Sequence, residues 1–252
     1  MPDTPLPTRP TDQIGAMALS ISETFVSLQG EGVLTGVPSL FIRTAGCNLR
    51  CGWCDTPYSS WNPEGAPRTI ASLIDEAKSS GVRHVVLTGG EPMLPDAIEP
   101  LSQALRGLGM HITIETAGTI HRPPARLACD LMSISPKLST STPVDDPRDP
   151  SGKWHEQHKQ RRMDPRVLGD LLRSFPVSQL KFVACDPKDL VEIETILKVI
   201  PAVRPERVLL MPEGTAPHGS GSTDWVVRAC IERGWRYCHR AHIDLFGNTR
   251  GT

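Results

Sequence analysis

The sequence predicts an α/β fold, a partial TIM-like barrel of about six parallel strands with outer helices. The first supporting observation is a regular alternation of short apolar runs with segments of helical periodicity, beginning near residue 38. The second is that polar loops follow the apolar runs, as in parallel sheets whose ligands gather at the carboxyl edge. Six such units are fewer than a closed barrel of this kind contains, so the barrel is expected to be partial.

Each expected strand is a short run rich in apolar and β-branched residues. These runs are residues 19–28, 38–46, 82–87, 110–115, 127–133, 180–183 and 207–211. The first run precedes the repeating part of the chain and ends at a glycine-containing turn. Apolar residues at helical spacing also predict helices, which begin at a Thr or Asp cap or at a proline. They cover residues 69–77, 95–108 and 186–200.

Composition and charge argue against several classes of function. The 252 residues include 27 basic and 28 acidic side chains, and the resulting formal charge of −1 predicts no broad attraction to nucleic acid. No apolar run approaches the ~20 residues of a membrane span, and the N-terminus lacks the pattern of a secretory signal. Seven cysteines, three of them clustered, favour a reducing compartment over a disulfide framework. We therefore expect a cytoplasmic protein that binds neither nucleic acid nor membrane.

The chain is long enough for one domain, which is expected to span residues 19–252. Residues 1–18 are rich in proline and lack apolar periodicity, so they are expected to form a disordered tail. Residues from about 138 to 163 also lack an apolar pattern and form a long inserted loop. This loop is expected either to be disordered or to fold over the site or onto a partner.

Three cysteines form the most informative cluster in the sequence. Cys47, Cys51 and Cys54 are spaced C-x3-C-x2-C after a predicted strand, and crowded thiolates are suited to holding a soft metal centre. A closed structural zinc site needs four ligands, whereas three leave one position open for chemistry. The spacing therefore favours a soft metal centre with one open coordination position. A zinc loop completed by a distant histidine, or three incidental thiols, are the alternatives.

Two further stretches suggest binding of charged groups. Arg43 lies inside an apolar strand, where a charge is costly unless paired, so it should face an anion or a carboxylate. A structural ion pair with Glu31 would explain Arg43 equally well. The stretch Thr88–Pro92, with sequence TGGEP, follows a predicted strand, and its glycines let main-chain groups approach a ligand closely. Glu91 adds an acceptor for a cationic amine, although an ordinary Gly-Gly loop is the alternative.

The cysteine spacing and the TGGEP stretch together resemble the radical S-adenosylmethionine superfamily. Further motifs make the resemblance narrower, and from about residue 19 to the C-terminus the sequence is similar to the 7-carboxy-7-deazaguanine synthase family. The stretches that carry this resemblance are Phe25–Gly32, Phe41–Leu49, Cys54–Thr56, Thr88–Pro92, Glu115–Gly118, Ser135–Lys137 and His242–Thr252. One departure is Ala117, where asparagine is common in the family.

This resemblance implies a radical S-adenosylmethionine lyase. Members of the family convert 6-carboxy-5,6,7,8-tetrahydropterin to 7-carboxy-7-deazaguanine with loss of ammonia, on the route to queuosine and other 7-deazapurines. They use a 4Fe–4S cluster, S-adenosylmethionine and Mg²⁺, are typically homodimers, and take an electron from a reductase such as flavodoxin. No side chain is expected to be catalytic, because the cluster and S-adenosylmethionine carry out the chemistry.

The resemblance also implies roles for individual residues. The cluster would be bound by Cys47, Cys51 and Cys54, and Mg²⁺ by Thr56. The S-adenosylmethionine pocket would be lined by Asp55, Gly90, Glu91, Thr116, Ser135 and Lys137. The substrate would be bound by Gln29, Glu31, Arg43, Thr88 and Thr252. In this assignment Arg43 holds the substrate carboxylate, while Gln29 and Glu31 read the amide and amine edges of the pterin.

Two other functions share some of these features. A glycyl-radical activating enzyme would use the same cluster, but it would need a large docking surface for a protein partner and neither Mg²⁺ nor Arg43. A zinc-binding interaction module would use the cysteines without catalysis. Metal analysis after anaerobic purification separates them, because zinc without a brown chromophore supports the module, whereas iron with sulfide supports an enzyme.

Overall fold

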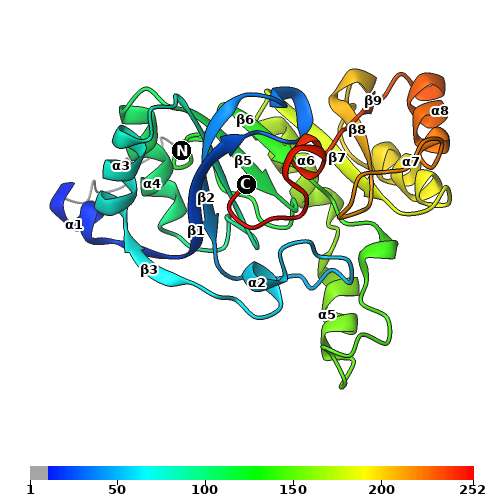
Figure 1. The fold of residues 1–252 in the computed structure, drawn as a ribbon, viewed down its shortest axis with the longest axis horizontal. Helices are drawn as coiled ribbons and strands as arrows, with labels where there is room; N and C mark the ends of the chain where they lie inside the picture. Colours follow the sequence, from blue (N-terminus) through cyan, green and yellow to red (C-terminus); the bar gives the residue numbers. More distant parts are fainter. Residues whose placement is uncertain (1–10) are drawn as a thin grey trace, which may run out of the picture.

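The computed structural model describes residues 11–252 (Figure 1). In this part of the chain the strands form one nine-stranded sheet in the order β3-β1-β2-β4-β5-β6-β7-β8-β9. The strands are β1 (Ala18–Leu28), β2 (Pro38–Thr44), β3 (Ala66–Thr69), β4 (His84–Gly89), β5 (His111–Thr116), β6 (Leu131–Ile134), β7 (Ser178–Ala184), β8 (Val208–Pro212) and β9 (Arg236–Tyr237). Neighbouring strands from β2 to β9 are parallel, whereas β1 pairs antiparallel with β2 and β3. The sheet is open, with β3 and β9 at its edges.

Helices occupy most of the connections between the parallel strands (Figure 1). The α-helices are α1 (Thr11–Ala16), α2 (Pro57–Ser60), α3 (Ile70–Ser79), α4 (Ile98–Gly107), α5 (Lys153–Arg161), α6 (Pro165–Ser174), α7 (Asp189–Val199), α8 (Asp224–Arg233) and α9 (Ala241–Phe246). Short 3-10 turns are η1 (Gly32–Leu34), η2 (Ser139–Ser141) and η3 (Pro205–Arg207).

The prediction of an α/β fold with six principal parallel strands is confirmed, because β2, β4, β5, β6, β7 and β8 run side by side in that order. The edge strands β3 and β9 were not predicted, since runs of four and two residues carry no periodic signal. The predicted cap of α3 is also confirmed, because Thr69 Oγ1 accepts a hydrogen bond from the Ser72 N–H at 3.2 Å.

Three predicted boundaries are wrong by a few residues. Strand β6 begins at Leu131, because the chain before it turns back, with the Leu127 N–H donating to the Pro123 carbonyl at 3.1 Å. Helix α4 begins three residues after the predicted Pro95. Helix α7 begins at Asp189 rather than at residue 187, because Asp189 Oδ2 accepts the Cys185 N–H at 2.8 Å and closes the preceding turn.

The predicted disordered tail over residues 1–18 needs correction. Residues 1–10 lie outside the described part of the chain, but α1 follows at Thr11 and β1 already begins at Ala18. Ile14 and Met17 pack against the hydrophobic core, and the Met17 carbonyl accepts the Ile70 N–H at 2.8 Å. Tertiary contacts therefore order residues whose local pattern is too weak to predict a helix.

Apolar side chains from the sheet and its covering helices form the main core. The central strands are buried along their length, as expected for parallel strands, and every residue of β7 is buried. Leu101 of α4, Leu171 of α6 and Ile193 of α7 are completely buried against the sheet. Among residues 11–252, the structure contains no helix with the length and apolar character needed to cross a membrane. The expected cytoplasmic location stays a prediction.

The predicted inserted loop over residues 138–163 is ordered. It contains η2 and α5, and α5 projects away from the sheet (Figure 1). His158 of α5 is completely buried, and its Nδ1 accepts the backbone N–H of Arg50 at 3.1 Å. The segment is therefore ordered rather than disordered, and it packs against the loop that carries Cys47, Cys51 and Cys54, here called the cysteine loop. Folding onto a partner stays a prediction.

Candidate active site

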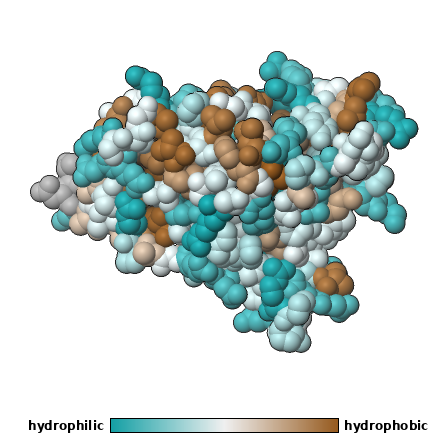
Figure 2. Space-filling model, in the orientation of Figure 1, coloured by the Kyte–Doolittle hydropathy of each residue, from teal (hydrophilic) through white to brown (hydrophobic). Residues whose placement is uncertain are grey.

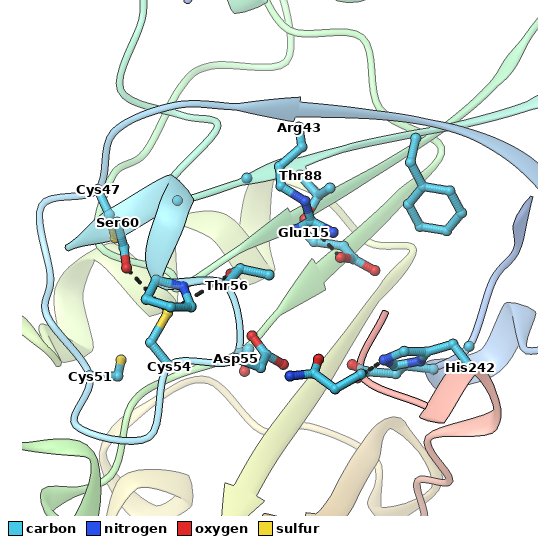
Figure 3. A pocket seen from close by; sticks show the side chains of 18 of the residues that line it. Arg43, Cys47, Cys51, Cys54, Asp55, Thr56, Ser60, Thr88, Glu115 and His242 are labelled. Carbon is cyan, nitrogen blue, oxygen red and sulfur yellow. Dashed lines mark hydrogen bonds and ion pairs between the residues drawn. The ribbon is translucent and has the colours of Figure 1, made fainter. Parts of the chain in front are cut away.

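A cavity of about 460 Å³ opens at the carboxyl ends of the parallel strands. Its walls come from the ends of β1, β2, β4 and β5, from the cysteine loop, and from the C-terminal residues 248–252. Figure 3 shows the three cysteines on one side of it, and Arg43 and His242 on other sides. This is the edge at which ligands of such sheets bind, so the cavity is the candidate active site.

With the exception of Glu91, the predicted site residues line this cavity. They are Gln29, Glu31, Arg43, Cys47, Cys51, Cys54, Asp55, Thr56, Thr88, Gly90, Thr116, Ser135, Lys137 and Thr252. The fold thus gathers at one edge residues that are more than 200 positions apart in the sequence.

The three cysteines are free thiols that face the cavity. Burial raises the pKa of Cys47 to about 12 and also raises that of Cys51, so both hold their protons until a metal displaces them. Within residues 11–252, no three His, Cys, Asp or Glu side chains come together as a site for a single metal ion. An iron–sulfur cluster places each cysteine on a different iron, so its sulfurs need not converge on one point. The donor set fits a cluster.

Glu31 lies on the cavity wall between two cations. Lys181 of β7 contacts Glu31 Oε2, and Arg240 Nε donates to Glu31 Oε1 at 3.1 Å. Burial by itself raises the pKa of Glu31, but the charges of Lys181 and Arg240 outweigh burial and lower it well below its usual value. Glu31 is therefore an anion in a buried ion-pair network. Arg240 also contacts Asp55 of the cysteine loop, so one guanidinium joins Glu31 to that loop.

Glu115 at the end of β5 is a second carboxylate on the cavity wall. Gln29 Nε2 donates to its Oε1 at 3.1 Å, and Thr88 Oγ1 donates to its Oε2 at 3.0 Å. Gln29 and Thr88 were predicted to contact substrate, whereas Glu115 was not assigned a role. Its position as a polar residue at the end of an apolar strand was the available signal.

Arg43 has the carboxylate partner that its burial predicted, but this partner is Glu23. Arg43 Nε donates to Glu23 Oε1 at 2.7 Å, and the Tyr58 hydroxyl donates to the same oxygen at 2.8 Å. The alternative ion pair with Glu31 is wrong, because Glu31 is held by Lys181 and Arg240. Strands β1 and β2 place Glu23 opposite Arg43 in antiparallel register, and this pairing was not evident from the sequence.

Glu91 lies behind the cavity wall rather than in it. Its side chain is completely buried, and its carboxylate accepts hydrogen bonds from Thr116 Oγ1 at 2.8 Å, from the Ala117 N–H at 2.9 Å and from the Met93 N–H at 3.1 Å. The prediction that Glu91 accepts a ligand amine directly therefore has no support in this arrangement. Its carboxylate instead joins the Gly-Gly loop to the end of β5 and orients Thr116, which does line the cavity.

The C-terminal segment closes one side of the cavity. The Arg250 guanidinium lies 4.2 Å from the centre of the Tyr58 ring, and its Nε donates to Glu23 at 3.2 Å. His242 packs on Gly30 so closely that a Cβ on this glycine would lie 2.0 Å from the imidazole. The functional side chains that sequence reasoning missed are Glu23, Glu115, Lys181, Arg240 and His242.

Comparison with known proteins identifies the family. A family model for the radical SAM superfamily matches residues 41–137. The curated 7-carboxy-7-deazaguanine synthase of Rhodopirellula baltica is 47% identical over 238 residues, which cover 93% of this chain and 89% of that protein. The chain belongs to the 7-carboxy-7-deazaguanine synthase family. The synthase of Halobacterium salinarum is 44% identical over 245 residues, or 93% of each chain. The resemblance inferred from the motifs is confirmed.

A solved structure agrees with this family. The crystal structure of QueE from Escherichia coli matches with a TM-score of 0.67 and 26% identity, over 91% of this chain and 96% of that chain. Membership of the synthase family and the radical SAM match imply a 4Fe–4S cluster and S-adenosylmethionine. These similarities support the synthase over a glycyl-radical activating enzyme or a zinc-binding module.

Substitution of Gly90 by alanine is expected to disturb the cysteine loop in this synthase. A Cβ on Gly90 would lie 2.2 Å from the carbonyl oxygen of Gly46, which directly precedes Cys47. The Gly46 carbonyl is backbone and cannot rotate away as a side chain would, so the loop must shift and the cysteines with it. Iron bound per chain after anaerobic reconstitution should fall by roughly half or more. Gly107→Ala is the matched control, because nothing lies within 4 Å of the added methyl. Full iron content in Gly90→Ala would contradict this prediction.

Proposed function

We propose that this protein converts 6-carboxy-5,6,7,8-tetrahydropterin to 7-carboxy-7-deazaguanine with loss of ammonia, in 7-deazapurine and queuosine biosynthesis. One observation carries the proposal: a single cavity is lined both by the three cysteines and by a set of buried charges suited to a small polar heterocycle. Similarity to the curated synthases over 93% of the chain supports the same assignment.

The cysteine side of the cavity would hold the cofactors. Cys47, Cys51 and Cys54 would bind the cluster, leaving one iron open for S-adenosylmethionine. The walls of the S-adenosylmethionine site would be formed by Asp55, Gly90, Thr116, Ser135 and Lys137. When bound, these groups supply the radical chemistry, while the protein positions the cofactor and the substrate.

The charged side of the cavity would bind the pterin. The guanidinium of Arg43 would hold the substrate carboxylate by charge-assisted hydrogen bonds. Glu31, kept anionic by Lys181 and Arg240, would accept hydrogen bonds from the amine edge of the ring. Gln29 would read the amide edge. With these assignments, the carboxylate of the substrate would meet a cation and its amine edge would meet an anion, so only one orientation of the substrate satisfies both contacts.

Other residues would complete the substrate site. Thr88 would contact the pterin beside Glu115, a second acceptor. Thr252, at the end of the C-terminal segment, would close over the substrate. One substitution tests the Glu115 contact: Glu115→Gln keeps the shape of the side chain and removes its charge, so it should weaken pterin affinity without changing iron content.

Thr56 is the proposed protein ligand to Mg²⁺. Its Oγ1 lies 3.8 Å from Cys54 Sγ, at the side of the cysteine loop that faces the cavity. Magnesium commonly takes few protein oxygens and completes its shell with water and substrate oxygens. Thr56→Ala should therefore raise the Mg²⁺ concentration needed for half-maximal activity by roughly tenfold, the loss of one ligand at ~1.4 kcal/mol. Thr195→Ala, at an exposed position of α7, is the control, and an unchanged Mg²⁺ titration in Thr56→Ala would remove the assignment.

The direct test of the proposed function is an anaerobic reaction. The reconstituted protein is incubated with carboxytetrahydropterin, S-adenosylmethionine, Mg²⁺ and a reductant, and 7-carboxy-7-deazaguanine is measured by mass. Product that depends on all four additions would support the proposal. A protein that holds its cluster and cleaves S-adenosylmethionine, yet leaves the pterin unchanged, would reject it.

We further propose that the protein is a homodimer and takes its electron from a reductase such as flavodoxin. Both proposals rest on the family. Light scattering on the purified protein tests the first, and replacement of dithionite by reduced flavodoxin tests the second.

A further inference from the structure

The outer side of the cysteine loop is covered by the segment of residues 138–163, here called the clamp segment. The backbone carbonyl of Ser141 accepts a hydrogen bond from the Gly52 N–H at 2.9 Å, and Arg148 Nη2 donates to the Gly52 carbonyl at 2.8 Å. The Arg50 N–H donates to His158 Nδ1 at 3.1 Å. The backbone N–H and carbonyl of Gly52, and the backbone N–H of Arg50, are therefore hydrogen-bonded to the clamp segment.

His158 is held on both sides of its ring. Because Nδ1 accepts the Arg50 N–H, the neutral imidazole carries its proton on Nε2 and donates it to Ser141 Oγ at 2.8 Å. The Ser141 hydroxyl donates in turn to the Leu138 carbonyl at 2.6 Å. His158 is completely buried, and burial lowers its pKa to about 4, so the ring stays neutral at physiological pH.

Two arginines that stack on aromatic rings donate hydrogen bonds to carbonyl groups of the loop. The Arg50 guanidinium lies 3.9 Å from the centre of the Trp154 ring of α5. Its Nη1 donates to the carbonyls of Cys47 and Leu49, each at 2.7 Å. Arg148 lies 4.1 Å from the centre of the Trp61 ring. Each guanidinium thus has an aromatic face beneath it, which limits the orientations it can adopt.

This arrangement matters because a loop without regular secondary structure must be ordered before it can bind a metal group. Ordering a ligand-bearing loop at the moment of binding costs affinity, and outer contacts that hold the ligands beforehand remove part of that cost. The radical SAM family model ends at residue 137, so the clamp segment lies directly beyond the part matched by the superfamily.

We propose that the clamp segment preorganises the cysteine loop for cluster binding, and that His158 is its central positioning residue. The inference rests on the proposed function only in naming an iron–sulfur cluster as the bound group. His158 does not contact the cluster in this account. It acts through the backbone of Arg50, next to Cys51.

The first test needs no metal. Hydrogen exchange of the peptide covering residues 46–54 and alkylation of Cys51 are measured in the apoprotein. His158→Leu should speed both at least tenfold, because the acceptor for the Arg50 N–H is lost and Cys51 becomes accessible. His158→Asn places an oxygen near the Nδ1 position and should restore much of the protection. Lys159→Ala, at an exposed position of the same helix, should behave as wild type.

The second test uses the reconstituted holoprotein. The rate at which a chelator removes iron should rise at least tenfold in His158→Leu, with a smaller change in His158→Asn. Arg148→Ala provides an independent variant if His158→Leu does not fold, since the Arg148 side chain is 34% exposed and its loss leaves the core intact. Wild-type exchange and iron release in a folded clamp variant would overturn the inference. If the clamp variants lose iron faster than wild type, but the wild-type holoprotein makes no deazapurine, the proposed function alone is defeated.

Discussion

Cys51→Ala is expected to abolish both the cluster and turnover. Cys51 is the middle cysteine of the loop, it is buried, and it lines the cavity together with Cys47 and Cys54. Two remaining thiols cannot hold three irons of a cluster, so iron and sulfide should fall to background and product should fall below detection. The measurements are iron and sulfide per chain, the brown absorption of the anaerobic protein, and product mass.

Cys185→Ala is the matched control for this prediction. Cys185 is an exposed free cysteine after β7 and lies outside the cavity lining, so its loss removes a thiol without touching the loop. It should retain iron content and turnover within about twofold of wild type. Turnover of the pterin by Cys51→Ala protein that contains no iron would defeat the radical reading of the whole site.

Arg43→Ala is expected to cause the second-largest loss, in substrate binding. The Arg43 side chain is largely buried and faces the cavity. Loss of a buried charge-assisted contact of about 2–5 kcal/mol would raise the dissociation constant of the pterin by roughly 30-fold to several thousandfold. Binding of S-adenosylmethionine and iron content should persist, because the cofactor side of the cavity does not depend on Arg43. Equilibrium binding of each ligand to the anaerobic protein separates the two.

The contact of Arg43 with Glu23 requires two controls. Arg43→Ala leaves Glu23 with Tyr58 and Arg250, so a thermal melt shows whether the fold tolerates the change. Arg68→Ala removes another arginine of an ion pair, but one outside the cavity, and should leave pterin affinity unchanged. Normal pterin binding by folded Arg43→Ala would show that its charge serves only the pair with Glu23.

Much of the site was predictable because its motifs are local. The cysteine spacing, the Gly-Gly loop and the polar residues after each apolar run occur in continuous stretches, and parallel strands bring their carboxyl ends to one edge. Residues such as Thr88 and Thr116 could therefore be assigned to the cavity before the fold was known. Glu91 is the instructive exception, because a short motif does not reveal whether a carboxylate faces a ligand or backbone N–H groups.

The ion pairs were not predictable, because their partners come from distant parts of the chain. Glu31 meets Lys181 and Arg240 only when the turn after β1, strand β7 and the residues that follow β9 pack together. The same holds for the clamp segment. Its sequence is polar and without periodicity, so it resembles a disordered loop, yet the buried contact of His158 with the cysteine loop orders it.

The sequence by itself determined the six principal parallel strands, the position of the cysteine loop and the family, since each depends on spacing and on side-chain type along a continuous stretch. Tertiary structure alone decided which charges neutralise one another and which segment holds the cysteine loop. The physical reason is that a buried charge or peptide group is tolerated only beside a suitable partner, and the partner is set by packing in three dimensions rather than by neighbours in the chain.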